Sequence, residues 1–189
     1  MKKLLFLIAA LSIQATAAAQ SSQQPETSSL SYSYAELRYV DVDTGGGDGF
    51  SFGGSYELDG PWILVGALNS LEFNNNVDFT LVEFGGGYVW TYANDFDLVS
   101  TLRFVRAEVD TPGGDSAESG FALSSGVRVL VTPEFEVRGS VNHLNLDNND
   151  TYLQLAGDYF FTDKASVGVS LDFGGDMDNF TLGFRWFFR

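Results

Sequence analysis

From residue 31 to the end of the chain, apolar and polar residues alternate with a period of two. In residues 165–173, Ala, Val, Val, Leu and Phe occupy every second position, and Ser, Gly, Ser and Asp lie between them. The same alternation recurs in 50–58, 121–131 and 180–188. Successive side chains of a strand point to opposite faces, so the pattern predicts β-strands with one apolar and one polar face. Apolar residues at helical spacing do not occur in this region, which predicts an all-β fold.

Turn residues divide this region into ten predicted strands. Clusters of Gly, Pro, Asn and Asp separate the alternating runs, and all four prolines fall outside strand interiors, where they would interrupt the hydrogen-bond ladder. Two strands deviate from simple alternation. In 62–71 both faces are apolar, and in 97–109 Arg103 and Arg106 fall on opposite faces, which predicts a bulge or a short extension beyond the rim there. The predicted strands are 31–43, 49–58, 62–73, 78–91, 96–109, 119–132, 135–147, 151–161, 165–174 and 179–188.

Aromatic residues gather at the strand ends. If the tail before residue 31 lies in the periplasm, all three tryptophans fall at the periplasmic rim. Interfacial girdles of this kind are typical of strands that cross a membrane. The predicted periplasmic girdle comprises Tyr32, Tyr34, Trp62, Trp90, Tyr92, Tyr159, Trp186 and Phe188. A second girdle at the outer rim comprises Phe50, Phe73, Phe79, Phe121, Phe173 and Phe180.

These features predict the architecture of residues 31–189. An open sheet edge is not tolerated in hydrocarbon, so the strands must close on themselves. The expected fold is a closed, antiparallel, up-and-down transmembrane β-barrel of ten strands, with eight strands as the alternative. An even number of strands places both termini on the periplasmic side.

The polar face of the predicted strands has the character of a lumen. It combines Gly, Ser and Thr with arginines and carboxylates, whereas lysine is almost absent. Paired charges of this kind suit a barrel interior, and a narrow barrel is filled by such side chains. We therefore expect a mostly occluded lumen, with a small pore as the alternative. The predicted lumen charges are Glu36, Arg38, Glu57, Glu83, Arg128, Glu136, Arg138, Asp158, Asp172 and Arg185.

The first nineteen residues, MKKLLFLIAALSIQATAAA, have the features of a signal peptide: a positive start, a short apolar run and a small-residue cleavage site. Residues 20–30 are polar and are interpreted as a periplasmic tail. The chain has no cysteine, which excludes disulfides and thiol catalysis. Its net charge of −15 argues against nucleic acid as a partner, because phosphates attract basic proteins.

No catalytic, cofactor-binding or metal-binding site is predicted. His143, the single histidine, lies on the apolar face near the outer end of its strand, where some barrel enzymes hydrolyse lipid A esters. Those enzymes carry a serine two residues after the histidine, and this chain has Asn145 there. The acidic outer loops are interpreted as a solvated rim. A divalent-cation site that bridges to lipopolysaccharide is the alternative.

The last strand carries the most specific resemblance. Residues 181–188, TLGFRWFF, resemble the C-terminal assembly signal of outer-membrane barrels, with Gly183, Trp186 and Phe188 at its Gly and aromatic positions and Arg189 as one extra residue. The signal implies the barrel assembly machinery and periplasmic chaperones as partners during biogenesis.

The whole mature chain resembles the small OmpA/OmpX-like and opacity-type outer-membrane barrels. Its opening, SYSYAELRYVDVD followed by GDGFSFGGSYEL, is most similar to ten-stranded members from gamma-proteobacteria. Such barrels include adhesins, envelope-stabilising proteins, small pores and a few enzymes. The resemblance implies a non-enzymatic protein of the cell outer membrane, in contact with lipid and lipopolysaccharide, with a structural, envelope-stabilising or surface-interaction role. A small, weakly cation-selective porin-like channel is the alternative, and a lipid-modifying enzyme is less favoured.

Overall fold

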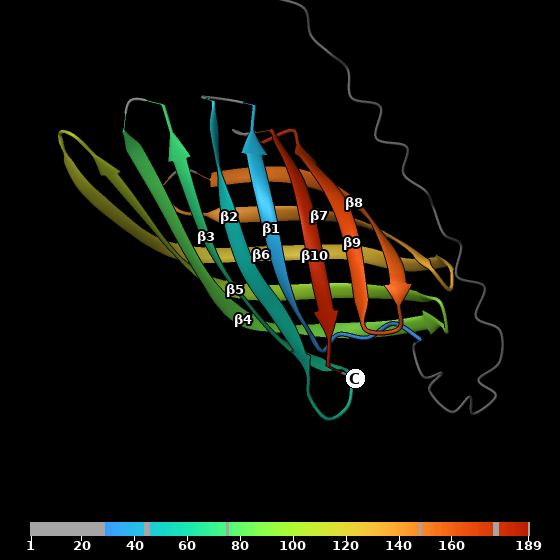
Figure 1. Ribbon diagram of the computed structural model, residues 1–189. Coiled ribbons are helices and arrows are strands. Elements are labelled where there is room, and N and C mark those ends of the chain that lie inside the picture. Colours follow the sequence, from blue (N-terminus) through green and yellow to red (C-terminus); the bar gives the residue numbers. More distant parts are fainter. Residues whose placement is uncertain (1–28, 44–45, 75, 148, 176–177, 189) are drawn as a thin grey trace, which may run out of the picture.

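The computed structural model describes residues 29–43, 46–74, 76–147, 149–175 and 178–188. Each strand pairs antiparallel with its neighbour in the chain, and the last strand pairs with the first, so the sheet closes into a barrel (Figure 1). The predicted ten-stranded barrel is confirmed, and the eight-stranded alternative is wrong. The strands are β1 (Tyr34–Val42), β2 (Gly47–Glu57), β3 (Trp62–Phe73), β4 (Val77–Ala93), β5 (Phe96–Thr111), β6 (Gly114–Thr132), β7 (Phe135–Asn145), β8 (Asn149–Thr162), β9 (Ala165–Phe173) and β10 (Asn179–Phe187).

The alternation in the sequence becomes an apolar outside and a polar inside. In β9, Val169 and Leu171 expose about half of their surface, whereas Ser166 and Ser170 are buried. A wall of exposed Val, Leu and Phe suits contact with lipid tails and would be unfavourable in water. A search of the described residues for a helix long and apolar enough to span a bilayer finds none.

The two ends of the barrel are named by the strand ends that lie there. We call the end at which β1 begins and β10 ends the proximal end, and the opposite end the distal end. The strands of β1–β3 and β10 cross those of β4–β6 at a steep angle (Figure 1), as strand tilt in a barrel requires. All three register shifts, at 91–93, 130–132 and 160–162, lie at the proximal end.

One wall extends beyond the rest at the distal end. β5 and β6 pair without a register shift as far as Thr111 and Gly114, so the expected feature in 97–109 is an extension and not a bulge. β7 meets β6 only from Phe121 onward, which leaves residues 114–120 of β6 without a partner in β7. The predicted start of this strand at 119 was late, because residues 114–118 are polar on both faces and carry no alternation.

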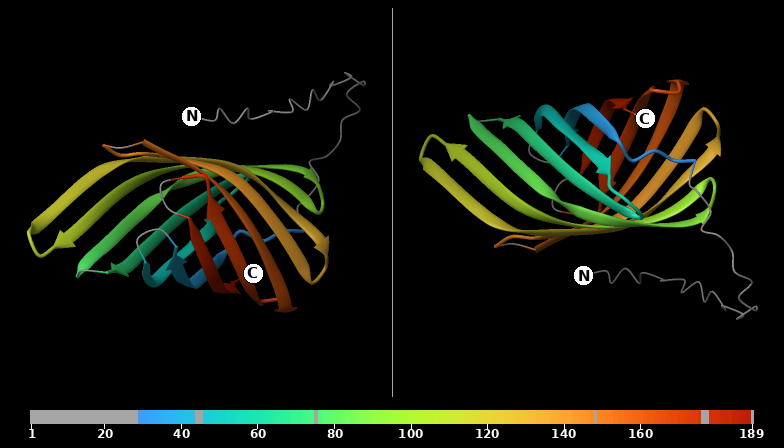
Figure 2. Two further views of the ribbon diagram at one scale, coloured as in Figure 1. Left: turned by 90° about the horizontal axis from the view of Figure 1, so that it is seen from above. Right: turned by 90° about the horizontal axis from the view of Figure 1, so that it is seen from below.

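The chain before β1 enters the barrel. Residues 29–33, here called the N-terminal segment, lie across the proximal opening (Figure 2), and Leu30 and Tyr32 are only 4–5% exposed. They form a small apolar core with Ile63 and Val89, against which Val65, Val99 and Leu130 pack. The predicted boundary between tail and barrel at 30/31 falls within this segment, and the first strand begins at Tyr34. The predicted signal peptide (1–19) and residues 20–28 of the predicted tail lie outside the described residues.

This apolar core explains the two apolar faces of β3. Leu64 and Leu68 expose about half of their surface on the outside of the barrel, whereas Ile63 is buried inside against the N-terminal segment. A strand that faces lipid on one side and a plugging segment on the other needs apolar residues on both faces.

Candidate functional site

A cluster of buried charges fills one side of the proximal interior. Each carboxylate of the cluster has one close arginine. Glu36 accepts a hydrogen bond from Arg38 (Nη2–Oε2, 2.8 Å). Glu136 accepts one from Arg128 (Nη2–Oε2, 2.7 Å), and Asp158 accepts one from Arg138 (Nη2–Oδ2, 2.8 Å). This central charge cluster consists of Glu36, Arg38, Arg128, Glu136, Arg138, Asp158 and Arg185.

Arg185 joins the three pairs. Its guanidinium lies 3.4 Å from Glu36, 3.8 Å from Glu136 and 3.8 Å from Asp158, and its side chain is 1% exposed. It also stacks over the ring of Tyr34 at 4.4 Å. β10 is therefore tied to β1, β7 and β8 through the interior. Charges this deeply buried require partners, and their mutual pairing fills the lumen where they meet.

The N-terminal segment is held by polar contacts from three strands. Glu57 at the end of β2 accepts the Tyr32 N–H (3.0 Å) and the Ser33 hydroxyl (3.4 Å). The Tyr32 hydroxyl donates to Asp97 of β5 (2.8 Å). Arg128 of β6 donates to the carbonyl oxygen of Ser31 (3.2 Å), and its guanidinium lies 4.2 Å from the centre of the Tyr32 ring.

Two predicted girdle residues are therefore misplaced in the sequence-based assignment. Tyr32 and Tyr34 lie inside the barrel, where arginine guanidinium groups stack on their rings. They precede Glu36 and Arg38 at intervals of two residues, and a period of two puts all four on the inner face. The other predicted members have side chains that are 47–83% exposed on the outer surface: Trp62, Trp90, Tyr92, Tyr159, Trp186 and Phe188.

The predicted outer girdle contains two further errors of the same kind. Phe79 lines the interior cavity, and Phe73 shares the inward face of Leu71, which is 7% exposed. Both were assigned by their position near a strand end and not by their parity. Phe50, Phe121, Phe173 and Phe180 are 37–60% exposed.

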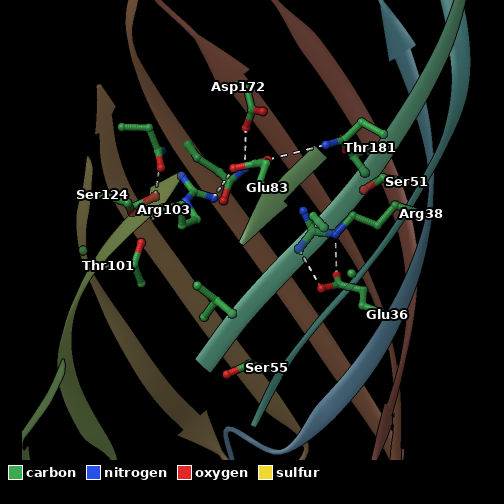
Figure 3. Close-up of a pocket in the computed structure, with 18 of the residues that line it drawn as sticks. Glu36, Arg38, Ser51, Ser55, Glu83, Thr101, Arg103, Ser124, Asp172 and Thr181 are labelled. Carbon is green, nitrogen blue, oxygen red and sulfur yellow. Dashed lines mark hydrogen bonds and ion pairs between the residues drawn. The ribbon is translucent and has the colours of Figure 1, made fainter. Parts of the chain in front are cut away.

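A cavity of about 370 Å³ lies in the lumen beside the central charge cluster (Figure 3). Its wall combines small and hydroxylated residues, such as Ser51, Thr101 and Ser124, with apolar and charged ones. Glu83 forms an ion pair with Arg103 (3.0 Å) on the far side of the cavity from Glu36 and Arg38. Asp172, a further predicted lumen charge, accepts a hydrogen bond from Gln154 (2.8 Å).

The sequence-based set of lumen charges omits Arg103 and Asp97. Arg103 lines the cavity, and Asp97 is fully buried beside Tyr32. Parity would have identified both, because they alternate with the outward Leu98 and Leu102. Arg106, by contrast, faces outward and pairs with Glu108 (2.8 Å) in the distal extension.

Among the residues that the structure describes, no group of three or more His, Cys, Asp or Glu side chains has an arrangement that could hold a metal ion. His143 lies on the outer surface and shares a hydrogen bond with Thr151 across β7 and β8 (2.8 Å). Asn145 occupies the position at which the lipid A-hydrolysing barrels carry a serine. Its side-chain amide donates a hydrogen bond to Asn149 Oδ1 (2.7 Å).

The family model of the outer membrane protein beta-barrel domain matches residues 4–173. The chain belongs to this family. Membership confirms the predicted resemblance and places the protein in the outer membrane. No curated protein matches the chain.

Several solved structures share this fold. An outer membrane channel from Pseudomonas putida F1 superposes with a TM-score of 0.53 at 9% identity, over 87% of this chain and 98% of that one. The KdgM porin gives 0.49 at 11% identity, over 82% and 99%. The attachment invasion locus protein Ail of Yersinia pestis gives 0.41 at 16% identity, over 81% and 94%. At 9–16% identity, the likeness to these proteins concerns the fold alone.

The predicted assembly signal lies on β10. Gly183 faces inward beside Arg38 and Glu36, where a Cβ would come within 3.2–3.4 Å of both side chains. Trp186 and Phe188 are about half exposed on the outer surface, whereas Phe187 between them is buried. Recognition of this strand by assembly factors stays a prediction.

Proposed function

We propose that the protein is a non-enzymatic outer-membrane barrel with a closed lumen, which supports the envelope structurally and contacts its surroundings through the distal rim. One observation carries the proposal. The central charge cluster and the N-terminal segment together fill the proximal interior, with Glu136, Arg185 and Asp97 at most 1% exposed. This filling argues against a permanently open pore, since a porin lumen is filled with water.

The orientation follows from the connections. Two-residue turns at 94–95, 133–134 and 163–164 and a four-residue connection at 58–61 join strands at the proximal end. At the distal end, four of the five connections have three to five residues, and a two-residue turn joins β5 to β6. Bacterial barrels keep short turns in the periplasm and longer loops outside. We therefore assign the proximal end, at which β1 begins and β10 ends, to the periplasm, and the distal rim to the lipopolysaccharide layer.

The outer wall supports a role in lipid. Lipid tails would contact the exposed Val, Leu and Phe residues, and the proximal ring of Trp62, Trp90, Tyr159 and Trp186 suits the headgroup region. The barrel assembly machinery and periplasmic chaperones are the expected partners during biogenesis, and lipid and lipopolysaccharide are the expected partners afterwards.

Deletion and complementation in the native host test this role. We expect the deletion strain to admit more of a hydrophobic dye across the outer membrane, and complementation with the wild-type gene to restore the barrier. A His143→Ala gene should complement equally well, and the mass of lipid A should be the same in all strains. A change in lipid A mass that requires His143 would reveal an enzyme. Steady ion conductance of the purified wild-type protein in planar bilayers would reveal an open pore. An intact barrier in the deletion strain would refute the envelope role.

A further inference from the structure

Two cavities meet at the N-terminal segment. The distal cavity runs from Asp150 and Asn179 at the distal strand ends to Tyr32 and Arg128. A second cavity of about 320 Å³ lies at the proximal end and is lined by Leu30, Ser31, Glu136 and Phe187, among others. The two linings are in direct contact. Arg128, which lines the first cavity, donates hydrogen bonds to Glu136 and to the carbonyl oxygen of Ser31, which line the second. The N-terminal segment and the Arg128–Glu136 ion pair therefore lie between the two spaces.

The two halves of the proximal interior are filled in different ways. On the side of β6–β10 and β1, the filling consists of strand residues of the central charge cluster, which bind one another. On the side of β2–β5, Glu57 and Asp97 bind the N-terminal segment, and the inward residues beside them are small or apolar, such as Ser55, Val65 and Val99. The space beside them is filled by Leu30 and Tyr32, which belong to no strand. On this side the closure depends on a piece of chain outside the barrel wall.

The contacts of the N-terminal segment allow its removal without damage to the sheet. Backbone hydrogen bonds hold its two ends, from the Ser29 N–H to the Asn94 carbonyl (2.7 Å) and from the Phe188 N–H to the Ser33 carbonyl (2.9 Å). Between these ends, the side chains of Glu57 and Arg128 bind its backbone. Such contacts can break while every strand pair of the barrel stays intact.

We propose that the N-terminal segment is a releasable plug, and that its displacement joins the two cavities into a narrow path for small cations. This goes beyond the closed barrel of the proposed function. Together with the central charge cluster, the charged groups around the vacated space would be five carboxylates, two of them Glu57 and Asp97, against four guanidinium groups. An excess of carboxylates at a constriction favours cations over anions.

Removal of the plugging side chains is the first test. The Leu30→Ala/Tyr32→Ala variant changes only residues that precede β1, so the barrel should still fold, which heat-modifiable gel mobility would verify. In planar bilayers with KCl, we expect the wild type to be almost silent and the variant to be open at least ten times as often, with a cation-selective reversal potential. The matched control is Tyr56→Ala/Tyr159→Ala, which removes two outward tyrosines at the same end and should stay silent.

A disulfide lock tests whether movement of the segment is the cause. The chain has no native cysteine, and Ser29 and Asn94 are joined by a backbone hydrogen bond, so a Ser29→Cys/Asn94→Cys pair suits a disulfide. Glu57→Ala should loosen the segment and produce intermittent openings. The added cysteine pair should abolish these openings when oxidised and restore them on reduction. Openings that are equally frequent with the disulfide oxidised and reduced would refute the proposal that the segment is a releasable plug.

The outcomes also separate the two proposals. Folded but silent Leu30→Ala/Tyr32→Ala and Glu57→Ala variants would refute the releasable plug and leave the closed barrel standing. Steady conductance of the wild type would instead refute the closed barrel.

Discussion

The charge balance of the central charge cluster predicts which of two substitutions destabilises the barrel more. The cluster contains four arginines and three carboxylates. Glu136→Gln would leave four guanidinium groups against two carboxylates in a buried space. Arg185→Met would leave three against three, and each carboxylate would keep its closest arginine. We therefore expect Glu136→Gln to be the more harmful change, although Arg185 is the larger buried side chain.

The magnitudes follow from the contacts. Glu136 is fully buried and lies 2.7 Å from Arg128, 3.4 Å from Arg138 and 3.8 Å from Arg185. Removing one partner of a buried ion pair costs about 3–5 kcal/mol of unfolding free energy, because a charge is left without compensation. Arg185 contributes only contacts of 3.4–3.8 Å, and methionine fills a similar volume, so we expect a loss of about 1 kcal/mol. The two variants should differ by about 2 kcal/mol or more, a factor of roughly 30 in the unfolding equilibrium.

Urea unfolding in lipid vesicles would measure this difference. The three tryptophans lie on the lipid-facing surface, so their fluorescence reports loss of the barrel, and heat-modifiable mobility gives an independent folded fraction. The Glu136→Gln/Arg185→Met double variant should be less destabilised than the sum of the single variants, because the second change removes one of the excess positive charges. The reasoning fails if Arg185→Met costs as much as Glu136→Gln, or if the two effects simply add.

Three further substitutions test other parts of the barrel. Gly85→Ala places a Cβ on the Leu102 carbonyl oxygen of the neighbouring strand, and we expect a loss of about 1–3 kcal/mol in urea unfolding. Gly113→Ala places a Cβ 3.8 Å from Thr111 Oγ1, an ordinary van der Waals contact, and should change little. Arg106→Ala removes an exposed ion pair, so the same measurement should show a change of less than about 1 kcal/mol; a larger loss would mean that the pair is shielded from water. Phe188→Ala should lower the amount of heat-modifiable barrel in the outer membrane, and an unchanged amount would argue against the assembly signal.

The period-two pattern was sufficient to predict the fold because lipid imposes a strict contrast on the two faces. A lipid-facing position such as Phe184 or Leu182 tolerates no charge, and turn residues mark each reversal of the chain. The number of strands followed from counting turns. Closure followed from the cost of an open edge in hydrocarbon, which leaves a barrel as the single solution for strands.

The details of the interior were harder to predict, since they depend on which distant residues meet. Tyr32 was assigned to the girdle because it is aromatic and near a strand end, although its parity with Glu36 places it inside. The plug left one trace in the sequence, the inward Ile63 and Val65 of a strand that is apolar on both faces. Alternation alone does not tell what covers such residues, because any apolar segment of the chain could do so.

The unequal lengths of the strands make the distal rim of the barrel asymmetric. Residues 114–120 of β6 stand free of β7, while β1, β9 and β10 have nine residues each against nineteen in β6. A membrane protein that diffuses in the plane of the bilayer therefore meets the polar extension of β6 when it approaches from one side. From the other side it meets the short strands β1, β9 and β10. Large molecules that approach the distal rim therefore have their easiest access from the side of β1, β9 and β10.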